Sequence, residues 1–100
     1  MPSRTESLER LLNARPQDTR LLFGLALEYL KEGRLEAGVE TLRKYLSVAD
    51  DEGNAWGRLG AALRQLGREP EAREAYARGI EAAERHGHPS MAEELREALG

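Results

Sequence analysis

Apolar residues recur along this chain at intervals of three and four, the spacing of an α-helix that is buried on one face. The first such stripe consists of Leu22, Leu25, Ala26 and Tyr29. The second consists of Val39, Leu42, Leu46 and Ala49. Gly33 lies between the two stripes, and glycine adopts the left-handed backbone angles that end a helix at low cost. The pattern therefore predicts two helices joined by a short turn.

The same pattern returns further along the chain, with Gly67 standing 34 residues after Gly33. At this interval apolar residues align with apolar residues and small residues with small ones. The aligned pairs include Leu22 with Trp56, Leu25 with Leu59, Ala26 with Gly60, Tyr29 with Leu63, Leu42 with Tyr76, Leu46 with Ile80 and Val48 with Ala82. Pro70 falls in the first turn of the second helix of this later hairpin, where proline is tolerated. The chain therefore contains two helical hairpins of one repeating type.

A helix is expected on either side of the two hairpins. Leu8 and Leu12 keep the repeat register with Leu42 and Leu46, which predicts the second helix of an incomplete leading repeat. At the other end the register fails, since Ser90 falls on a position that should be buried. A last helix still carries an apolar stripe at Met91, Leu95, Ala98 and Leu99. It is typical of a capping helix, which shields the final apolar face of a repeat array.

These elements predict one all-α domain over residues 1–100, since a chain of 100 residues has room for a single core. The expected architecture is a right-handed helical-hairpin repeat array of about six antiparallel helices. Its parts are a half-repeat helix at 5–14, a first repeat at 18–50, a second repeat at 52–86 and a capping helix at 89–99.

Two stretches resemble the tetratricopeptide repeat, whose pattern is Trp-x2-Leu-Gly-x2-Tyr followed by Ala-x3-Phe and a proline. The closer match is Trp56-x2-Leu59-Gly60-x2-Leu63 followed by Ala72-x3-Tyr76, and the looser one is Leu22-x2-Leu25-Ala26-x2-Tyr29 followed by Gly38-x3-Leu42. The family's proline survives only at Pro16. The chain is similar to the short stand-alone bacterial members of the family. This resemblance implies an adaptor that binds other proteins, and it implies no reaction, so we do not expect an enzyme.

In this family the first helix of each hairpin lines a concave groove that holds the ligand. Carried over by position, the groove residues of the first repeat are Arg20, Phe23, Leu27, Leu30 and Lys31, and those of the second are Asn54, Gly57, Arg58, Ala61 and Arg64. Phe23, Leu27 and Leu30 form a second apolar stripe beside the core stripe, and basic residues surround it. Such a groove suits a peptide or helix of a partner protein that carries apolar and acidic residues.

What covers this second stripe is left open by the sequence. One of the end helices, a second copy of the chain or a ligand would each serve. A self-associating, homodimeric protein is therefore the alternative function, because two complete repeats are fewer than the about three that such arrays usually need. A receptor for the carboxylate tails of chaperones is disfavoured. Its clamp uses a Lys and an Asn one turn apart, where this chain has Phe23 and Leu27.

Composition excludes several other classes. A net charge of -3 and a pI near 5.5 argue against nucleic acid as the partner. The absence of cysteine excludes disulfides, zinc–thiolate sites and thiol nucleophiles. No apolar run resembles a signal peptide or a membrane span, so we expect a cytoplasmic protein without a membrane partner. Lys31 and Lys44 are the only lysines among 15 basic residues, a bias that fits a GC-rich bacterial genome.

One constellation invites a chemical interpretation, the pair His86 and His88 around Gly87. A metal site there would need a third ligand such as Glu84 or Glu93, and a metal-binding or enzymatic role at the pair is the weakest of the alternatives. We favour a polar turn in which Gly87 ends one helix and Pro89 begins the next. We expect no catalytic residue, no resident metal and no cofactor, because neither a phosphate loop nor an oriented nucleophile is present.

Overall fold

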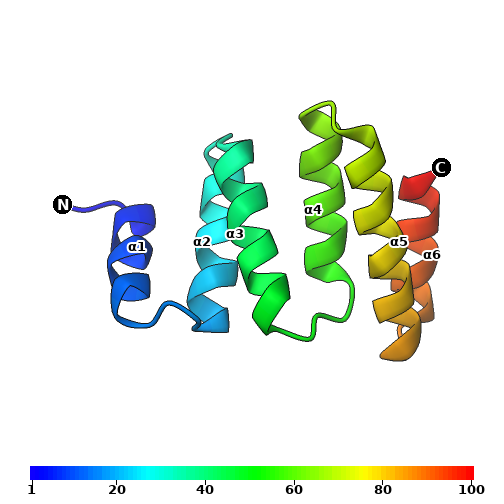
Figure 1. Cartoon of the computed structure of the whole chain (residues 1–100), viewed down its shortest axis with the longest axis horizontal. Helices are drawn as coiled ribbons and strands as arrows, with labels where there is room; N and C mark the ends of the chain where they lie inside the picture. Colours follow the sequence, from blue (N-terminus) through cyan, green and yellow to red (C-terminus); the bar gives the residue numbers. More distant parts are fainter. The chain divides into compact units, whose positions relative to one another are not determined.

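The computed structural model describes all residues from 1 to 100 and consists of six α-helices without a strand, which confirms the all-α prediction. The helices are α1 (Arg4–Ala14), α2 (Thr19–Lys31), α3 (Leu35–Val48), α4 (Asn54–Gln65), α5 (Glu69–Arg85) and α6 (Pro89–Leu99), as labelled in Figure 1. Their contacts divide the chain into two compact units, residues 1–49 and 50–100. The expectation of one domain over 1–100 stays a prediction.

The helices begin and end at residues whose chemistry accounts for the boundaries. Ser3 and Glu6 form a capping box at α1, in which the Ser3 hydroxyl accepts the Glu6 N–H at 3.1 Å. The Asp18 carboxylate accepts the Leu21 N–H at 3.1 Å and caps α2. At the C-terminal ends of α2, α4 and α5 stand Gly33, Gly67 and Gly87, with φ of 77°, 77° and 74°. The three short turns predicted at glycine are therefore confirmed.

The first unit is built on the hairpin of α2 and α3. Its core uses the predicted stripe of α2, with Leu22, Leu25, Ala26 and Tyr29 buried. They meet Val39 and Leu42 of α3, which are also buried. The two helices come close together at Gly38, where an added Cβ would lie 2.5 Å from Leu30 Cδ2. Only glycine fits this contact unless Leu30 moves.

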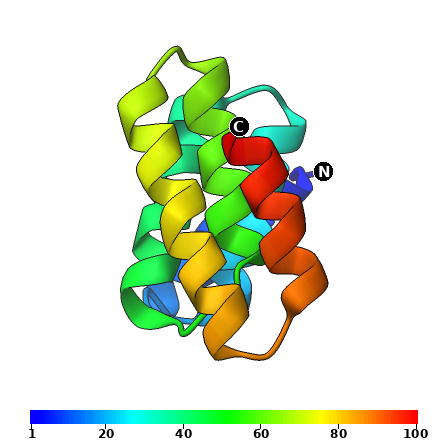
Figure 2. The ribbon, with the colours of Figure 1, turned by 90° about the vertical axis from the view of Figure 1, so that its right-hand side faces the viewer.

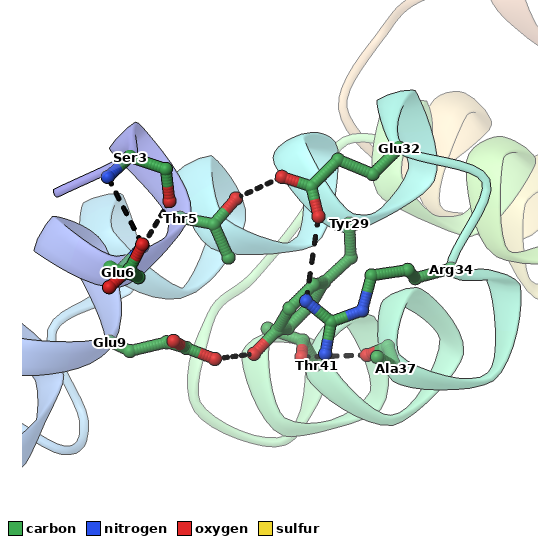
Figure 3. A network of polar contacts seen from close by, with 9 residues as sticks. All are labelled: Ser3, Thr5, Glu6, Glu9, Tyr29, Glu32, Arg34, Ala37 and Thr41. Carbon is green, nitrogen blue, oxygen red and sulfur yellow. Dashed lines mark hydrogen bonds and ion pairs between the residues drawn. The ribbon is translucent and has the colours of Figure 1, made fainter.

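Helix α1 docks on this hairpin through Leu8, the half-buried Leu12 and several polar contacts. Leu8 joins Leu25 and Tyr29 in a buried cluster. The Tyr29 hydroxyl donates to the Glu9 carboxylate, and the Thr5 hydroxyl donates to Glu32 Oε2 at 2.5 Å (Figure 3). The same carboxylate of Glu32 also bonds Arg34, whose guanidinium lies 4.5 Å above the Tyr29 ring (Figure 3). The half-repeat helix is thus held by apolar packing and by hydrogen bonds to charged groups.

The second unit repeats the hairpin with α4 and α5. Gly60 lies directly against Tyr76, since an added Cβ would be 2.9 Å from two atoms of the ring. Leu59 and Leu63 of α4 are fully buried. The turn before α4 carries a feature that the sequence did not indicate, the buried carboxylate of Asp51. Its Oδ2 accepts the N–H of Gly53 at 2.8 Å and of Ala55 at 2.9 Å, and so caps the start of α4.

Helix α6 lies along α5 in this unit (Figure 2). Its Leu95 lies between two glycines. A Cβ at Gly57 of α4 would lie 2.8 Å from Leu95 Cδ2, and a Cβ at Gly79 of α5 would lie 3.0 Å from Leu95 Cδ1. The aligned positions of the first unit, Phe23 and Tyr45, hold two aromatic rings with centroids 5.1 Å apart. In place of this aromatic pair, the second hairpin has Gly57 and Gly79, which form a socket for the side chain of Leu95. This finding accounts for both glycines.

We expect Leu95→Ala to lower the free energy of unfolding by about 2–5 kcal/mol, because it empties the socket between Gly57 and Gly79. Leu11→Ala is the matched control, since Leu11 is 49% exposed and should cost little. Urea unfolding followed by circular dichroism measures both. Equal losses for the two variants would contradict the proposed role of the socket.

The docking of α1 should weaken at alkaline pH through Tyr29. Burial, together with the hydrogen bond and charge of Glu9, raises the pKa of Tyr29 from 10.0 to about 12. The unfolded chain releases this proton near pH 10 while the folded chain keeps it, so the stabilisation is complete below pH 10 and is lost towards pH 12. Tyr29→Phe should remove this part of the alkaline loss and cost about 1–3 kcal/mol at neutral pH, because it deletes a hydrogen bond to a carboxylate.

Urea titrations at several pH values between neutral and pH 12 compare the variant with the parent chain. If the parent and Tyr29→Phe lost stability in parallel as the pH rises, the proposed linkage would be wrong.

Candidate functional site

The second apolar stripe of α2 is partly covered within its own hairpin. Phe23 packs its ring against Tyr45 of α3, and Leu30 packs against Gly38 of α3. Phe23, Leu27 and Leu30 are all half-buried, so none is fully exposed or fully enclosed. The sequence offered an end helix or a second copy as cover and missed α3. The available signal was Tyr45, a large residue aligned with Gly79 of the later repeat.

Two cations stand on α2 without a charged partner. Arg20 is in the first turn and Lys31 is the last residue of the helix. Both are exposed, and neither has a carboxylate within ion-pair distance. Arg4 of α1 differs, since it pairs with Glu28 of α2 at 2.8 Å. Arg20 and Lys31 are therefore available to anionic groups outside the chain.

On α4 the structure separates the predicted residues into two groups. Asn54 and Arg58 are exposed, and Arg58 Nε donates to Asn54 Oδ1 at 3.0 Å. Arg64 is engaged within the unit instead. It pairs with Glu69 through two contacts of 3.0 and 2.8 Å and lies 5.0 Å above the Tyr76 ring. The hydrogen bond from Arg64 lowers the pKa of Glu69.

Arg64 also holds the end of α6, a contact that the repeat pattern does not predict. Its Nη1 donates to the carbonyl of Ala98, and Arg73 Nη1 donates to the carbonyl of Leu99 at 3.1 Å. The last carbonyls of a helix lack partners within the helix and carry partial negative charge, so cations satisfy them well. Arg64 therefore stabilises the fold of the second unit.

A pocket of about 350 Å³ lies between α4 and α6. Its apolar wall is formed by Gly57 and Ala61 of α4 together with Met91, Leu95 and Ala98 of α6, and Tyr76 of α5 also contributes. The charged residues that line it are Arg58 on α4 and Glu94 on α6. Sequence reasoning identified the α4 side alone, because the register of α6 relative to α4 could not be read from the repeat.

The histidine pair lies in the predicted turn between α5 and α6. His86 Nε2 is 3.1 Å from Asp50 Oδ2, and Arg85 Nη2 is 2.7 Å from Asp50 Oδ1. The hydrogen bond from His86, helped by Arg85, lowers the pKa of Asp50. No group of three or more His, Asp or Glu side chains is placed to hold a metal ion. His86 thus ties the end of α5 to the segment before α4.

None of the six helices combines the length and the apolar character that crossing a bilayer requires.

The model of the tetratricopeptide repeat family matches residues 6–54 and, in a second register, residues 23–87. The TPR repeat-containing protein PA0015 of Pseudomonas aeruginosa is 30% identical over 90 residues, which cover 90% of this chain and 86% of that protein. Among solved structures, protein BPP2914 from Bordetella parapertussis superposes with a TM-score of 0.82 at 30% identity, covering 99% of this chain and 86% of that one.

A second solved structure, the crystal structure of MamA, has a TM-score of 0.75 at 20% identity and matches 95% of this chain and 64% of its own. That likeness concerns the fold alone. Repeats of this kind are typically non-enzymatic scaffolds and support a role in protein–protein interaction. The matched segments include both hairpins and carry the Trp56 and Leu22 patterns on which the resemblance rested. The chain belongs to the tetratricopeptide repeat family.

Proposed function

We propose that this chain is an adaptor that binds a peptide or helix of another protein through the first helices of its hairpins, α2 and α4. The observation that carries the proposal is the second apolar stripe of α2. Phe23, Leu27 and Leu30 remain half-buried although α3 already packs against the same helix. Packing on α3 accounts for part of Phe23 and Leu30, and the apolar surface that stays exposed along the stripe suits contact with a partner.

The charges on the two first helices favour a partner that carries acidic residues. Arg20 and Lys31 on α2 and Arg58 on α4 are exposed and have no carboxylate partner. Exposed charges at the edge of a binding surface mainly speed association and reject partners of the wrong sign. Arg64 is left out of the proposed surface because Glu69 and the end of α6 already occupy it. The cytoplasmic location expected from the sequence stays a prediction.

Leu27 is the best position at which to test the proposal. Phe23 packs on Tyr45, so changing it risks the hairpin, whereas Leu27 lies between Phe23 and Leu30 on the stripe. We expect Leu27→Asp to reduce capture of the natural partner at least about tenfold, because a charge in an apolar contact costs more than about 1.4 kcal/mol. The measurement is quantitative capture from a lysate of the source cells, with circular dichroism to show that the helices persist.

Val48→Asp is the matched control, since Val48 is a 41% exposed apolar residue of α3 that does not belong to the stripe. Retention of every partner by Leu27→Asp, with loss in Val48→Asp, would contradict the proposal. The identity of the captured protein separates the two functions that the sequence left open. A second copy of this chain as the only protein captured would indicate the self-associating alternative.

A further inference from the structure

We propose that the pocket between α4 and α6 holds one aliphatic side chain of a partner peptide, with an acidic residue of that peptide at Arg58 and a basic residue at Glu94. This inference rests on the proposed function and deepens it, because it names the chemistry of the bound segment. It concerns residues of the second unit only.

The hollow exists because the second hairpin has small residues where the first has large ones. Gly57 and Ala61 of α4 align with Phe23 and Leu27 of α2 in the repeat register. In the first unit Phe23 fills the space in front of α3 by packing against Tyr45. In the second unit Leu95 fills the socket at Gly57 and Gly79, and the space beside Ala61 stays open. The substitution pattern thus creates the pocket without loosening the core.

The shape and lining of the pocket suit an apolar side chain together with a short stretch of backbone. Its volume of about 350 Å³ lies at the small end of the about 300–1,000 Å³ found for ligand pockets. Met91 and Ala98 of α6 are half-buried and line it together with the exposed Ala61 of α4. These apolar groups gain free energy if a partner removes them from water.

The two charged residues of the pocket have no charged partner within the chain. Arg58 has one hydrogen bond, to the side-chain oxygen of Asn54, and no carboxylate within ion-pair distance. Glu94 is exposed and has neither an ion pair nor a hydrogen bond. By contrast, Arg64 pairs with Glu69, and Arg96 pairs with Glu84 and Glu93. One free cation and one free anion therefore border a single apolar hollow, on different helices.

This arrangement decides the kind of occupant. A nucleic acid or an anionic membrane surface would meet Arg58 favourably but would be repelled by Glu94. An uncharged lipid chain would leave both charges without a counterpart. A peptide with an aliphatic residue between an acidic and a basic residue can place the aliphatic side chain on the apolar lining, the acidic one at Arg58 and the basic one at Glu94. We therefore assign the pocket to such a peptide.

The test is a titration of the intact, ¹⁵N-labelled chain by nuclear magnetic resonance. The probe peptides are blocked at both ends and carry a central leucine between a glutamate and a lysine, in both sequence orders. A second peptide carries lysine on both sides of the leucine, and a third has serine in place of the leucine. We expect shifts centred on Gly57, Ala61, Met91 and Leu95 with the first peptides, and much weaker shifts with serine at the centre.

Two variants make the test specific. The parent chain should bind the peptides with one glutamate and one lysine about tenfold more tightly than the peptide with two lysines. Arg58→Glu should reverse this preference. Ala61→Phe should abolish binding by filling the hollow, and Ala61 is exposed, so the fold should survive. Arg20→Glu is the matched control. It reverses the charge of an unpaired arginine that lies on α2 and not at the pocket, so the preference should stay unchanged.

The outcomes separate this inference from the function on which it rests. Absence of shifts at the pocket with millimolar peptide would overturn the inference. The inference would also be overturned if Arg58→Glu left binding unaltered, or if the shifts were confined to α2. In these cases loss of the natural partner in Leu27→Asp would still support the adaptor. If the peptides fail and Leu27→Asp also keeps its partner, both proposals fall.

Discussion

The structure depends on two places where the helices of a hairpin approach so closely that a side chain larger than glycine would not fit without rearrangement. In the first unit Gly38 lies under Leu30, and in the second Gly60 lies under Tyr76. Each contact fixes the distance between the first and second helix of its hairpin and so decides which residues meet in the core. Once the hairpin is closed, one apolar face of each unit still needs cover, and α1 and α6 provide it.

The two covering helices achieve this by different physical means. Helix α6 inserts Leu95 into the socket left by Gly57 and Gly79, and arginines from α4 and α5 bind its final carbonyls. Helix α1 buries Leu8 and Thr5 and depends on Glu9, Glu32 and Arg4 for much of the rest. Hydrogen bonds and ion pairs of that kind respond to pH and salt, whereas the burial of Leu95 does not. We therefore expect α1 to be the part of the chain that opens most readily.

The repeat in the sequence was enough to predict the number of helices, the glycine turns and the cap. Periodicity identifies which face of a helix is apolar, and glycine at a fixed interval marks where the helix ends. It does not say which neighbour reaches that face. For this reason Tyr45 as the cover of Phe23, the engagement of Arg64 by Glu69 and the capping carboxylate of Asp51 were all missed. Each depends on contacts between segments whose distance in space the pattern does not encode.

The proposed binding surfaces follow from the same comparison of the two hairpins. The first hairpin has Phe23 and Leu27 on α2, which belong to an apolar stripe. The second hairpin has Gly57 and Ala61 at the aligned positions of α4, which line a pocket. One repeat type thus gives two kinds of apolar contact on its first helices. A partner peptide would use side chains of different size at each.

The most direct test of partner binding through the first helices is photo-crosslinking inside the cells that make the protein. A photoreactive side chain at position 27 of α2 is compared with the same side chain at position 40 of α3, an exposed site on the other helix of the hairpin. We predict a crosslinked product with a different polypeptide from position 27 and none from position 40. Crosslinks from position 40 alone, or from position 27 only to a second copy of this chain, would contradict the proposed function.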